Sequence, residues 1–167
     1  MNNKVIGIIV AIVVVFGVAY FISKQNNKDG SPNQTSTSTS KSQASGATLG
    51  LSGQQLTSLP ETVLSRTDVT ILNLSNNQLT ALPASISGLT NLVELNVENN
   101  RLESLPPEIS QLKNLRKLRF DNNRLTTLPD ELGNMIWLKE LDVSNNRLSQ
   151  SQLDKIKSML TDTEVKT

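Results

Sequence analysis

The chain has 167 residues, enough for one small domain and a membrane anchor. Its 16 Lys and Arg residues and 15 Asp and Glu residues give a formal charge of +1, so the overall charge does not indicate a nucleic-acid partner. Cysteine and histidine are both absent, which excludes disulfides, zinc fingers, thiol nucleophiles and histidine-based triads. Aromatic residues make up only 3%. We therefore expect neither an enzyme nor a cofactor or metal site.

An apolar run near the N-terminus is suited to a membrane. Residues 5–22 read VIGIIVAIVVVFGVAYFI, a run without a single charged side chain. As a helix they would extend over roughly 27 Å, just enough to cross the hydrocarbon core of a bilayer. We predict a transmembrane helix over residues 5–22 that follows a short tail, residues 1–4. A signal peptide cleaved ahead of Tyr20 is the alternative, and the protein would then be secreted.

The next segment changes character. In residues 31–46, twelve of sixteen residues are Ser, Thr, Asn or Gln. Such a segment cannot bury enough apolar surface to offset the entropy of ordering, so residues 23–46 are predicted to be a disordered linker. A Ser- and Thr-rich stalk is typical of the outer side of a membrane. We therefore expect a single-pass protein of the cell membrane whose remaining domain is extracytoplasmic.

The remainder of the chain is built from repeats of constant length. A degenerate copy begins at Gly46, and the clearest copies begin at Val69, Leu92, Leu115 and Leu138, which gives a 23-residue period. Within each copy, positions 4, 6 and 11 are apolar, position 9 is Asn or Gln, and Leu-Pro fills positions 14 and 15 in the first four copies. Apolar residues at positions 4 and 6 predict a short strand with both side chains on one face. Stacked position-9 amides can satisfy the backbone of the turn that follows, and proline ends the extended segment.

This pattern resembles the leucine-rich repeat family, L-x-x-L-x-L-x-x-N-x-L-x-x-L-P, in its 23-residue subclass. The resemblance covers residues 46–160 and implies an α/β solenoid, with parallel strands on the concave face and short helices or turns on the convex face. We assign residues 47–167 to this domain, with about five repeats, and expect it to be monomeric. Its last copy continues with apolar residues at helical spacing, which predicts a capping helix over about residues 151–160 and a final short strand at 163–165.

Side chains at positions 3, 5 and 7 should face the concave surface. Because adjacent parallel strands lie about 4.8 Å apart, residues of one column become neighbours. Charges alternate in sign along Glu94–Lys117–Glu140 and in the Arg119–Asp142 pair, which fits either a self-neutralising surface or a polar binding face. With Lys117 and Arg119 at the centre, the candidate partner-binding residues are Glu94, Asn96, Glu98, Lys117, Arg119, Asp121, Glu140, Asp142, Arg101 and Arg124.

Two features near this surface need separate interpretation. Glu98 and Asp121 are neighbours at position 7, and paired carboxylates can do acid–base work or hold Ca²⁺, but nothing else in the sequence supports such a site. We expect Arg119 or Arg101 to neutralise them. Arg101, Arg124 and Arg147 share position 10, where stacked guanidinium groups can bind anions of a partner or pair locally with acidic residues.

Trp137 stands where the earlier repeats have Asn91 and Asn114. We expect it to pack over the C-terminal cap, with a partner contact as the alternative.

The expected function is a membrane-tethered binding module without chemistry of its own. A solenoid offers an extended curved surface rather than a pocket, and the family resemblance implies a protein, or another polymeric ligand, as partner. A structural cell-envelope protein that associates with copies of itself is the alternative. No nucleic-acid partner is expected.

Overall fold

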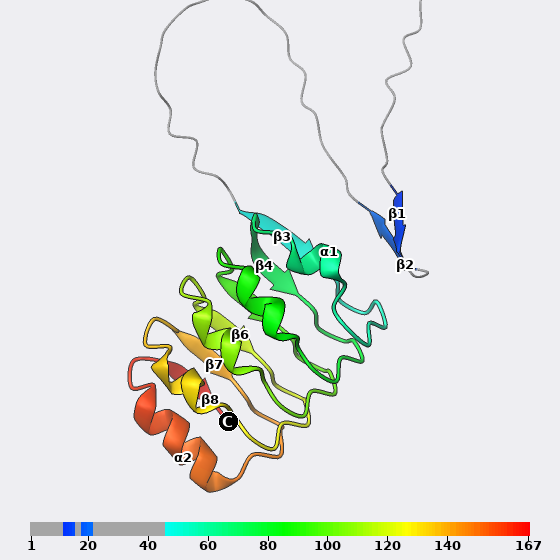
Figure 1. The fold of residues 1–167 in the computed structure, drawn as a ribbon. Coiled ribbons are helices and arrows are strands. Elements are labelled where there is room, and N and C mark those ends of the chain that lie inside the picture. Colours follow the sequence, from blue (N-terminus) through cyan, green and yellow to red (C-terminus); the bar gives the residue numbers. More distant parts are fainter. Residues whose placement is uncertain (1–11, 16–17, 22–45) are drawn as a thin grey trace, which may run out of the picture. The chain divides into compact units, whose positions relative to one another are not determined.

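The computed structural model describes residues 12–15, 18–21 and 46–167. Residues 46–167 form one compact unit, and residues 12–15 and 18–21 belong to a separate one. In Figure 1 the larger unit is a stack of short strands, with short helices on the side opposite the sheet. Each unit is described by itself below.

The apolar N-terminal run is partly in strands. Strands β1 (Ile12–Val15) and β2 (Val18–Phe21) pair antiparallel. These residues were expected to lie in a transmembrane helix over 5–22, and that helix is not seen. A run such as Ile-Val-Val-Val is β-branched throughout, and short apolar runs of this kind favour strands as readily as buried helices. Among the described residues, no helix is both long and apolar enough to cross a bilayer. The rest of 5–22, the tail 1–4 and linker residues 23–45 lie outside the described residues.

The larger unit contains one parallel sheet, in which consecutive strands are neighbours. Each strand is short because only positions 3 to 5 of most repeats are extended. The constant length of the repeat brings equivalent positions side by side from β4 to β7. The strands are β3 (Ala47–Gly50), β4 (Val69–Asn73), β5 (Glu94–Asn96), β6 (Lys117–Arg119), β7 (Glu140–Asp142) and β8 (Glu164–Lys166).

Short helices return the chain on the other side of each repeat. Each of the first four begins directly after the proline of position 15, whose extended backbone leads into the turn. One apolar side chain per turn points into the core, for example Ile86 and Ile109, both fully buried. The helices are α1 (Glu61–Leu64), η1 (Ala84–Gly88), η2 (Pro107–Gln111), η3 (Asp130–Asn134) and α2 (Gln150–Met159), where η marks a 3₁₀ helix.

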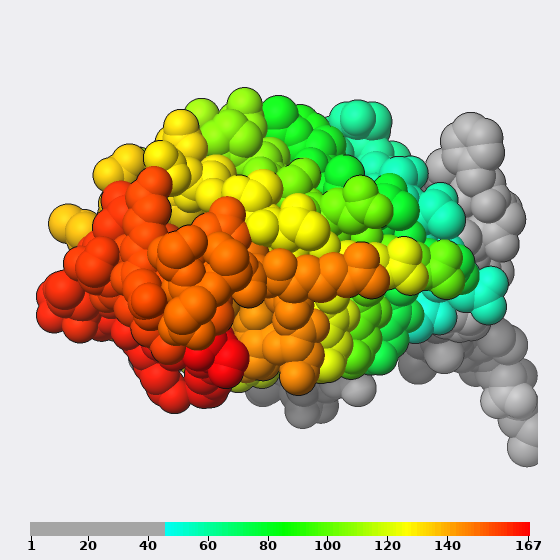
Figure 2. All heavy atoms as spheres, turned by 90° about the horizontal axis from the view of Figure 1, so that it is seen from below, coloured from blue at the N-terminus to red at the C-terminus, as the bar shows by residue number. Residues whose placement is uncertain are grey.

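Apolar side chains of successive repeats stack into a continuous core. The position-4 residues Leu72, Leu95 and Leu118 are fully buried, as are most residues at positions 6 and 11. At the N-terminal end, Leu49 in the same column is only half-buried. This arrangement confirms the predicted leucine-rich repeat solenoid. In Figure 2 the colours run in chain order across the surface, as expected for repeats that contact only their neighbours.

A ladder of buried asparagines links the repeats at position 9. The Asn100 side-chain oxygen accepts a hydrogen bond from Leu79 N at 3.0 Å, and its amide nitrogen donates to the carbonyl oxygens of Leu74 at 2.9 Å and Val97 at 3.1 Å. Two of these groups belong to the preceding repeat, so one side chain satisfies backbone groups of both repeats. Equivalent contacts are made by Asn77, Asn123 and Asn146.

The residue before each ladder asparagine has a different role. Asn76, Asn99, Asn122 and Asn145 have positive φ angles between 53° and 57°, and Gly53 fills this position in the first copy with φ 69°. Asparagine and glycine tolerate this left-handed conformation better than other residues. The Asn-Asn pair therefore combines a turn residue with a ladder residue.

The last apolar layer is covered as predicted by a helix. Helix α2 begins one residue earlier than expected, after Ser149, whose hydroxyl oxygen accepts a hydrogen bond from Gln152 N at 3.3 Å. Ile156 within this helix and Leu160 directly after it are buried. The strand expected at 163–165 is β8, shifted by one residue to Glu164–Lys166.

Candidate functional site

The strand face comprises the side chains at positions 3, 5 and 7 of the repeats. The register pairs Ile71 with Glu94, Glu94 with Lys117, and Lys117 with Glu140, so the predicted position-3 column is confirmed. Position 5 forms a second column, Asn73, Asn96, Arg119 and Asp142. The candidate residues on β5, β6 and β7 are therefore brought together on one face.

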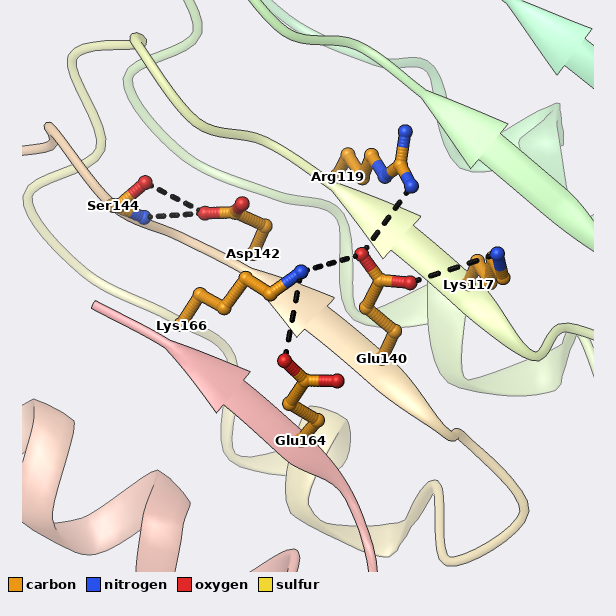
Figure 3. A network of polar contacts seen from close by, with 7 residues as sticks. All are labelled: Lys117, Arg119, Glu140, Asp142, Ser144, Glu164 and Lys166. Atoms are coloured by element: carbon orange, nitrogen blue, oxygen red, sulfur yellow. Dashed lines mark hydrogen bonds and ion pairs between the residues drawn. The ribbon is translucent and has the colours of Figure 1, made fainter.

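Glu140 is the centre of an ion cluster on this face, drawn in Figure 3. Its carboxylate lies 3.0 Å from Lys166 Nζ, 3.3 Å from Arg119 Nη2 and 3.7 Å from Lys117 Nζ. Only 12% of the Glu140 side chain is exposed. The hydrogen bond from Lys166, together with the positive charges of Arg119 and Lys117, holds the pKa of Glu140 below its ordinary value despite its desolvation. We call Lys117, Arg119, Glu140 and Lys166 the Glu140 cluster.

The cluster differs from the predicted pairs in two ways. Arg119 was expected to pair with Asp142, but it turns to Glu140. Asp142 instead accepts hydrogen bonds from Ser144 N at 3.1 Å and Ser144 Oγ at 2.7 Å. Within residues 46–167, Lys117 forms its ion pair with Glu140 and none with Glu94.

Lys166 was not among the predicted site residues. It reaches the face because β8 pairs with β7, placing Lys166 beside Asp142 and Glu164 beside Glu140. Glu164 comes one position later in the chain than the repeat period would place it, because the final return segment contains the longer helix α2. A count by the repeat period therefore places the wrong residues on the last strand.

The position-5 amides are used within the protein. Asn96 Oδ1 accepts a hydrogen bond from Glu98 N at 2.9 Å, and Asn73 Oδ1 accepts one from Ser75 N at 3.0 Å. Such local side-chain-to-backbone bonds stabilise the turn after the strand. Both amides lie on the strand face, so their side-chain nitrogens are the groups that could donate to a ligand.

The acidic pair at position 7 is not neutralised by arginine. Burial raises the pKa of Asp121, and the negative charges of Asp142 and Glu98 raise it further. Asn122 donates a hydrogen bond to Asp121 Oδ2 at 2.8 Å. Neither Arg119 nor Arg101 forms an ion pair with Asp121 or Glu98 in residues 46–167, so the predicted neutralisation is wrong. The described part of the chain has no group of three or more side chains arranged to hold a metal ion.

Arg101 and Arg124 lie outside the strand face. They follow the ladder asparagines Asn100 and Asn123, and their side chains are exposed in the turn beside the face. Arg147 occupies the same place one repeat later and is also exposed. These three residues form the arginine column.

Trp137 faces the preceding repeat. Its indole nitrogen donates to the Leu112 carbonyl oxygen at 3.0 Å, and Lys113 Nζ lies 4.1 Å from the ring centroid. Asn114 makes the corresponding backward bond, to Thr90, at 2.9 Å. Trp137 thus makes a similar bond to the preceding repeat, with an acceptor one position earlier in that repeat. Both contacts are with the preceding repeat, and packing over the C-terminal cap stays a prediction.

A small cavity lies away from the strand face, between η3 and α2. Its volume is about 100 Å³, and Pro129, Gln152, Ile156 and Met159 are among its lining residues. None of the candidate residues lines it, so the candidate site is an open surface and not a pocket.

Comparisons with known proteins agree with this architecture. The family model described as "Leucine-rich repeat region" matches residues 68–162. No curated protein matches the chain. A solved leucine-rich repeat protein of Leptospira interrogans is 39% identical, with a TM-score of 0.69 over 71% of this chain and 30% of that one. Internalin C2 of Listeria monocytogenes is 24% identical, with a TM-score of 0.60 over 72% of this chain and 50% of that one.

A second Listeria monocytogenes internalin is 22% identical, with a TM-score of 0.57 over 65% of this chain and 31% of that one. The two internalins therefore show a shared fold only. The chain spans half or less of the length of each of these structures. The family model covers more than half of the chain, with the 23-residue period and the asparagine ladder inside the matched region. The chain belongs to the leucine-rich repeat proteins.

Proposed function

We propose that this protein is a membrane-tethered recognition module that binds a protein, or another polymeric ligand, on its strand face. The observation that carries the proposal is the continuous parallel sheet from β3 to β8, which brings the side chains at positions 3, 5 and 7, most of them half-buried or exposed, onto one face. Extended surfaces of this kind suit large partners, whereas small molecules need concave pockets. Leucine-rich repeat domains commonly mediate protein–protein contacts, which supports a binding module over an enzyme.

The strand face has two halves of different chemistry. The C-terminal half carries the Glu140 cluster, where Lys117 and Arg119 already have an acidic partner. The N-terminal half, on β3 and β4, is uncharged and carries small or neutral side chains. Ile71, 36% exposed, is the large apolar side chain exposed on a strand within residues 46–167. We propose that Ile71 and Asn96 contribute apolar and hydrogen-bonding contacts, and that a ligand reaching Lys117 or Arg119 competes with Glu140.

The proposed binding surface can be tested by changing an isoleucine on the strand face and, as a control, an isoleucine away from it. The full-length chain, in a non-ionic detergent, is used to capture partners from membranes and extracellular extracts of its host. Ile71→Arg, and separately the double change Lys117→Glu and Arg119→Glu, should reduce capture of the specific partner. Ile136→Arg is the matched control, because Ile136 is 72% exposed and precedes Trp137, away from the strands. If Ile136→Arg or Trp137→Ala abolishes capture and both strand-face variants retain it, the proposed surface is wrong.

The tether is proposed from the sequence of the apolar run. Residues 5–22 carry no charge and are long enough for a membrane-spanning helix, which inside a bilayer would have to replace the β1–β2 pairing because a lone pair of strands leaves backbone groups unsatisfied there. We propose that they hold the protein in the cell membrane, with the repeat domain on the outer side. Protease added to intact cells should then degrade the repeat domain, and deletion of residues 1–22 should release it from the membrane fraction. Protection of the domain until the cells are lysed would reverse the orientation.

A further inference from the structure

The arginine column is a feature that the strand face does not use. The backbone of each arginine is hydrogen-bonded to the preceding repeat. Arg124 N donates to Leu102 O and Arg147 N donates to Leu125 O, both at 2.9 Å. Arg101 N makes the same bond to the preceding repeat, also at 2.9 Å. Each arginine stands between a ladder asparagine and an inward-pointing leucine. The three side chains must therefore project outward in register.

The positive charges of the column are not neutralised within the described domain. In residues 46–167, none of the three guanidinium groups has an ion-pair partner, unlike Lys117 and Arg119, which contact Glu140. Like charges in adjacent rungs repel one another, and nothing in the fold requires arginine here. The first two repeats have Gln55 and Gln78 at this position. The column thus holds three cations in a row without an internal counterion.

The dimensions of the column suit an extended polypeptide. Two rung spacings of about 4.8 Å give roughly 10 Å, the length of about three residues of extended chain. Guanidinium groups form forked, charge-assisted hydrogen bonds with carboxylates. A polymer with its charges on the backbone, such as polyphosphate, fits less well, because an extended peptide turns every second side chain to its opposite face. Glu98 and Asp121 lie three residues before Arg101 and Arg124, and Glu103 lies two residues after Arg101. Residues 47–167 carry a net charge of −2, from 12 basic and 14 acidic residues. A polypeptide can place neutral side chains opposite these carboxylates.

We propose that the arginine column, Arg101, Arg124 and Arg147, binds an acidic extended polypeptide segment through guanidinium–carboxylate pairs. This site lies beside the strand face and is distinct from the surface proposed above. It can be tested without knowledge of the partner, so its failure would leave the strand-face proposal standing.

The test measures the fluorescence anisotropy of a labelled hexaglutamate peptide titrated with the full-length chain in a non-ionic detergent. Labelled hexaglutamine gives the uncharged control. The test variant combines Arg101→Gln, Arg124→Gln and Arg147→Gln, changes that the native Gln78 shows to be compatible with the turn, since its backbone nitrogen donates to Leu56 O at 2.8 Å as the arginines do in the later repeats. The matched control combines Lys113→Gln, Arg116→Gln and Lys139→Gln, which removes the same number of charges elsewhere on the repeats.

We expect the unmodified chain and the control variant to bind hexaglutamate, and the test variant to bind about tenfold more weakly or not at all. Binding should also weaken as salt rises from about 20 to about 150 mM, as the Debye length shortens to about 8 Å. Equal losses in both triple variants would mean that only net charge matters and would overturn the site. So would binding to polyphosphate or to vesicles of anionic lipid with no binding to hexaglutamate.

Discussion

Each ladder asparagine satisfies backbone groups of its own repeat and of the repeat before it. At Asn100 the amide nitrogen lies within 3.2 Å of three carbonyl oxygens, while the side-chain oxygen accepts from Leu79 N. Three of these four hydrogen bonds are buried, and an unpaired donor or acceptor in a buried place is costly. The side chain therefore holds the turn of its own repeat and fixes the spacing to the repeat before it.

Asn100→Ala should be strongly destabilising for this reason. We expect a loss of roughly 2–4 kcal/mol in the free energy of unfolding, since several buried backbone groups lose their partners at once. Asn146→Ala provides the comparison, because Asn146 makes equivalent bonds but is only half-buried. Its loss should be smaller, as water can replace part of the contacts. Urea unfolding followed by circular dichroism measures both; equal effects of the two changes would contradict the role of burial.

The Glu140 cluster should make stability depend on pH. The pKa of Glu140 is lowered from its ordinary value of 4.5, first by the hydrogen bond from Lys166. A carboxyl group whose pKa falls on folding stabilises the native state above the unfolded-state pKa, and this contribution is lost as the pH falls through the native-state pKa. Glu140→Gln should therefore lower the melting temperature by about 2–4 °C at pH 7, and the difference should vanish at acidic pH.

Asp121→Asn is the control of opposite sign. The pKa of Asp121 is raised by burial and by the neighbouring acidic residues Asp142 and Glu98, so its ionised form is unfavourable in the folded state. Removing that charge should leave the melting temperature unchanged or higher at pH 7. Thermal melts from pH 3 to pH 8 test both changes. Similar losses for the two variants would show that the carboxylates contribute through packing and not through charge.

At the scale of elements, the C-terminal cap depends on a close contact between η3 and α2. Gly133 is buried, and a Cβ atom built at this position would overlap Met159 Cε and lie 3.0 Å from Met159 Cβ. The flexible end of methionine can move, but its Cβ is fixed by the helix. A side chain at residue 133 therefore separates the cap from the last complete repeat.

Gly133→Ala should lower the free energy of unfolding by about 1–2 kcal/mol, as expected for overpacking. Adding Met159→Ala should recover part of the loss, giving a clear coupling in a double-mutant cycle. Gly50→Ala is the matched control, because a Cβ there meets no atom within 4 Å and the change should be nearly neutral. Urea unfolding curves measure all four proteins. Additive effects at residues 133 and 159 would mean that the cap does not press on η3.

The strands that keep the 23-residue period could be predicted from the sequence, while the last strand, which departs from that period, could not. The register of β4 to β7 followed directly from the 23-residue period, because each column repeats the same chemistry. Lys166 was missed because the longer helix α2 shifts β8 by one residue. The choice of Glu140 over Asp142 as the partner of Arg119 could not be predicted either. This choice depends on the hydrogen bond that Ser144 donates to Asp142 and on the ion pair between Lys166 of β8 and Glu140.

At the scale of the whole repeat domain, stability should vary along the stack. A solenoid is stabilised by contacts between neighbouring repeats, so the terminal repeats have one neighbour fewer. The C-terminal end is covered by α2 and β8, and Ile156 and Leu160 are buried there. Within residues 46–167, β3 and β8 each have a strand on one side only, but no helix precedes β3 to cover the half-buried Leu49. The N-terminal edge is therefore the weaker end.

Hydrogen exchange should reveal this gradient. We expect backbone amides of β5 and β6 to exchange most slowly, those of β8 faster, and those of β3 fastest, because local opening at an end breaks the contacts of one repeat only. Mass spectrometry of peptides from the full-length chain, at a pH where exchange is slow, measures the order. Uniform protection from β3 to β8 would show that the domain opens only as a whole. If β3 alone were as protected as β5, another part of the chain would have to cover Leu49, and the edge would be a closed surface.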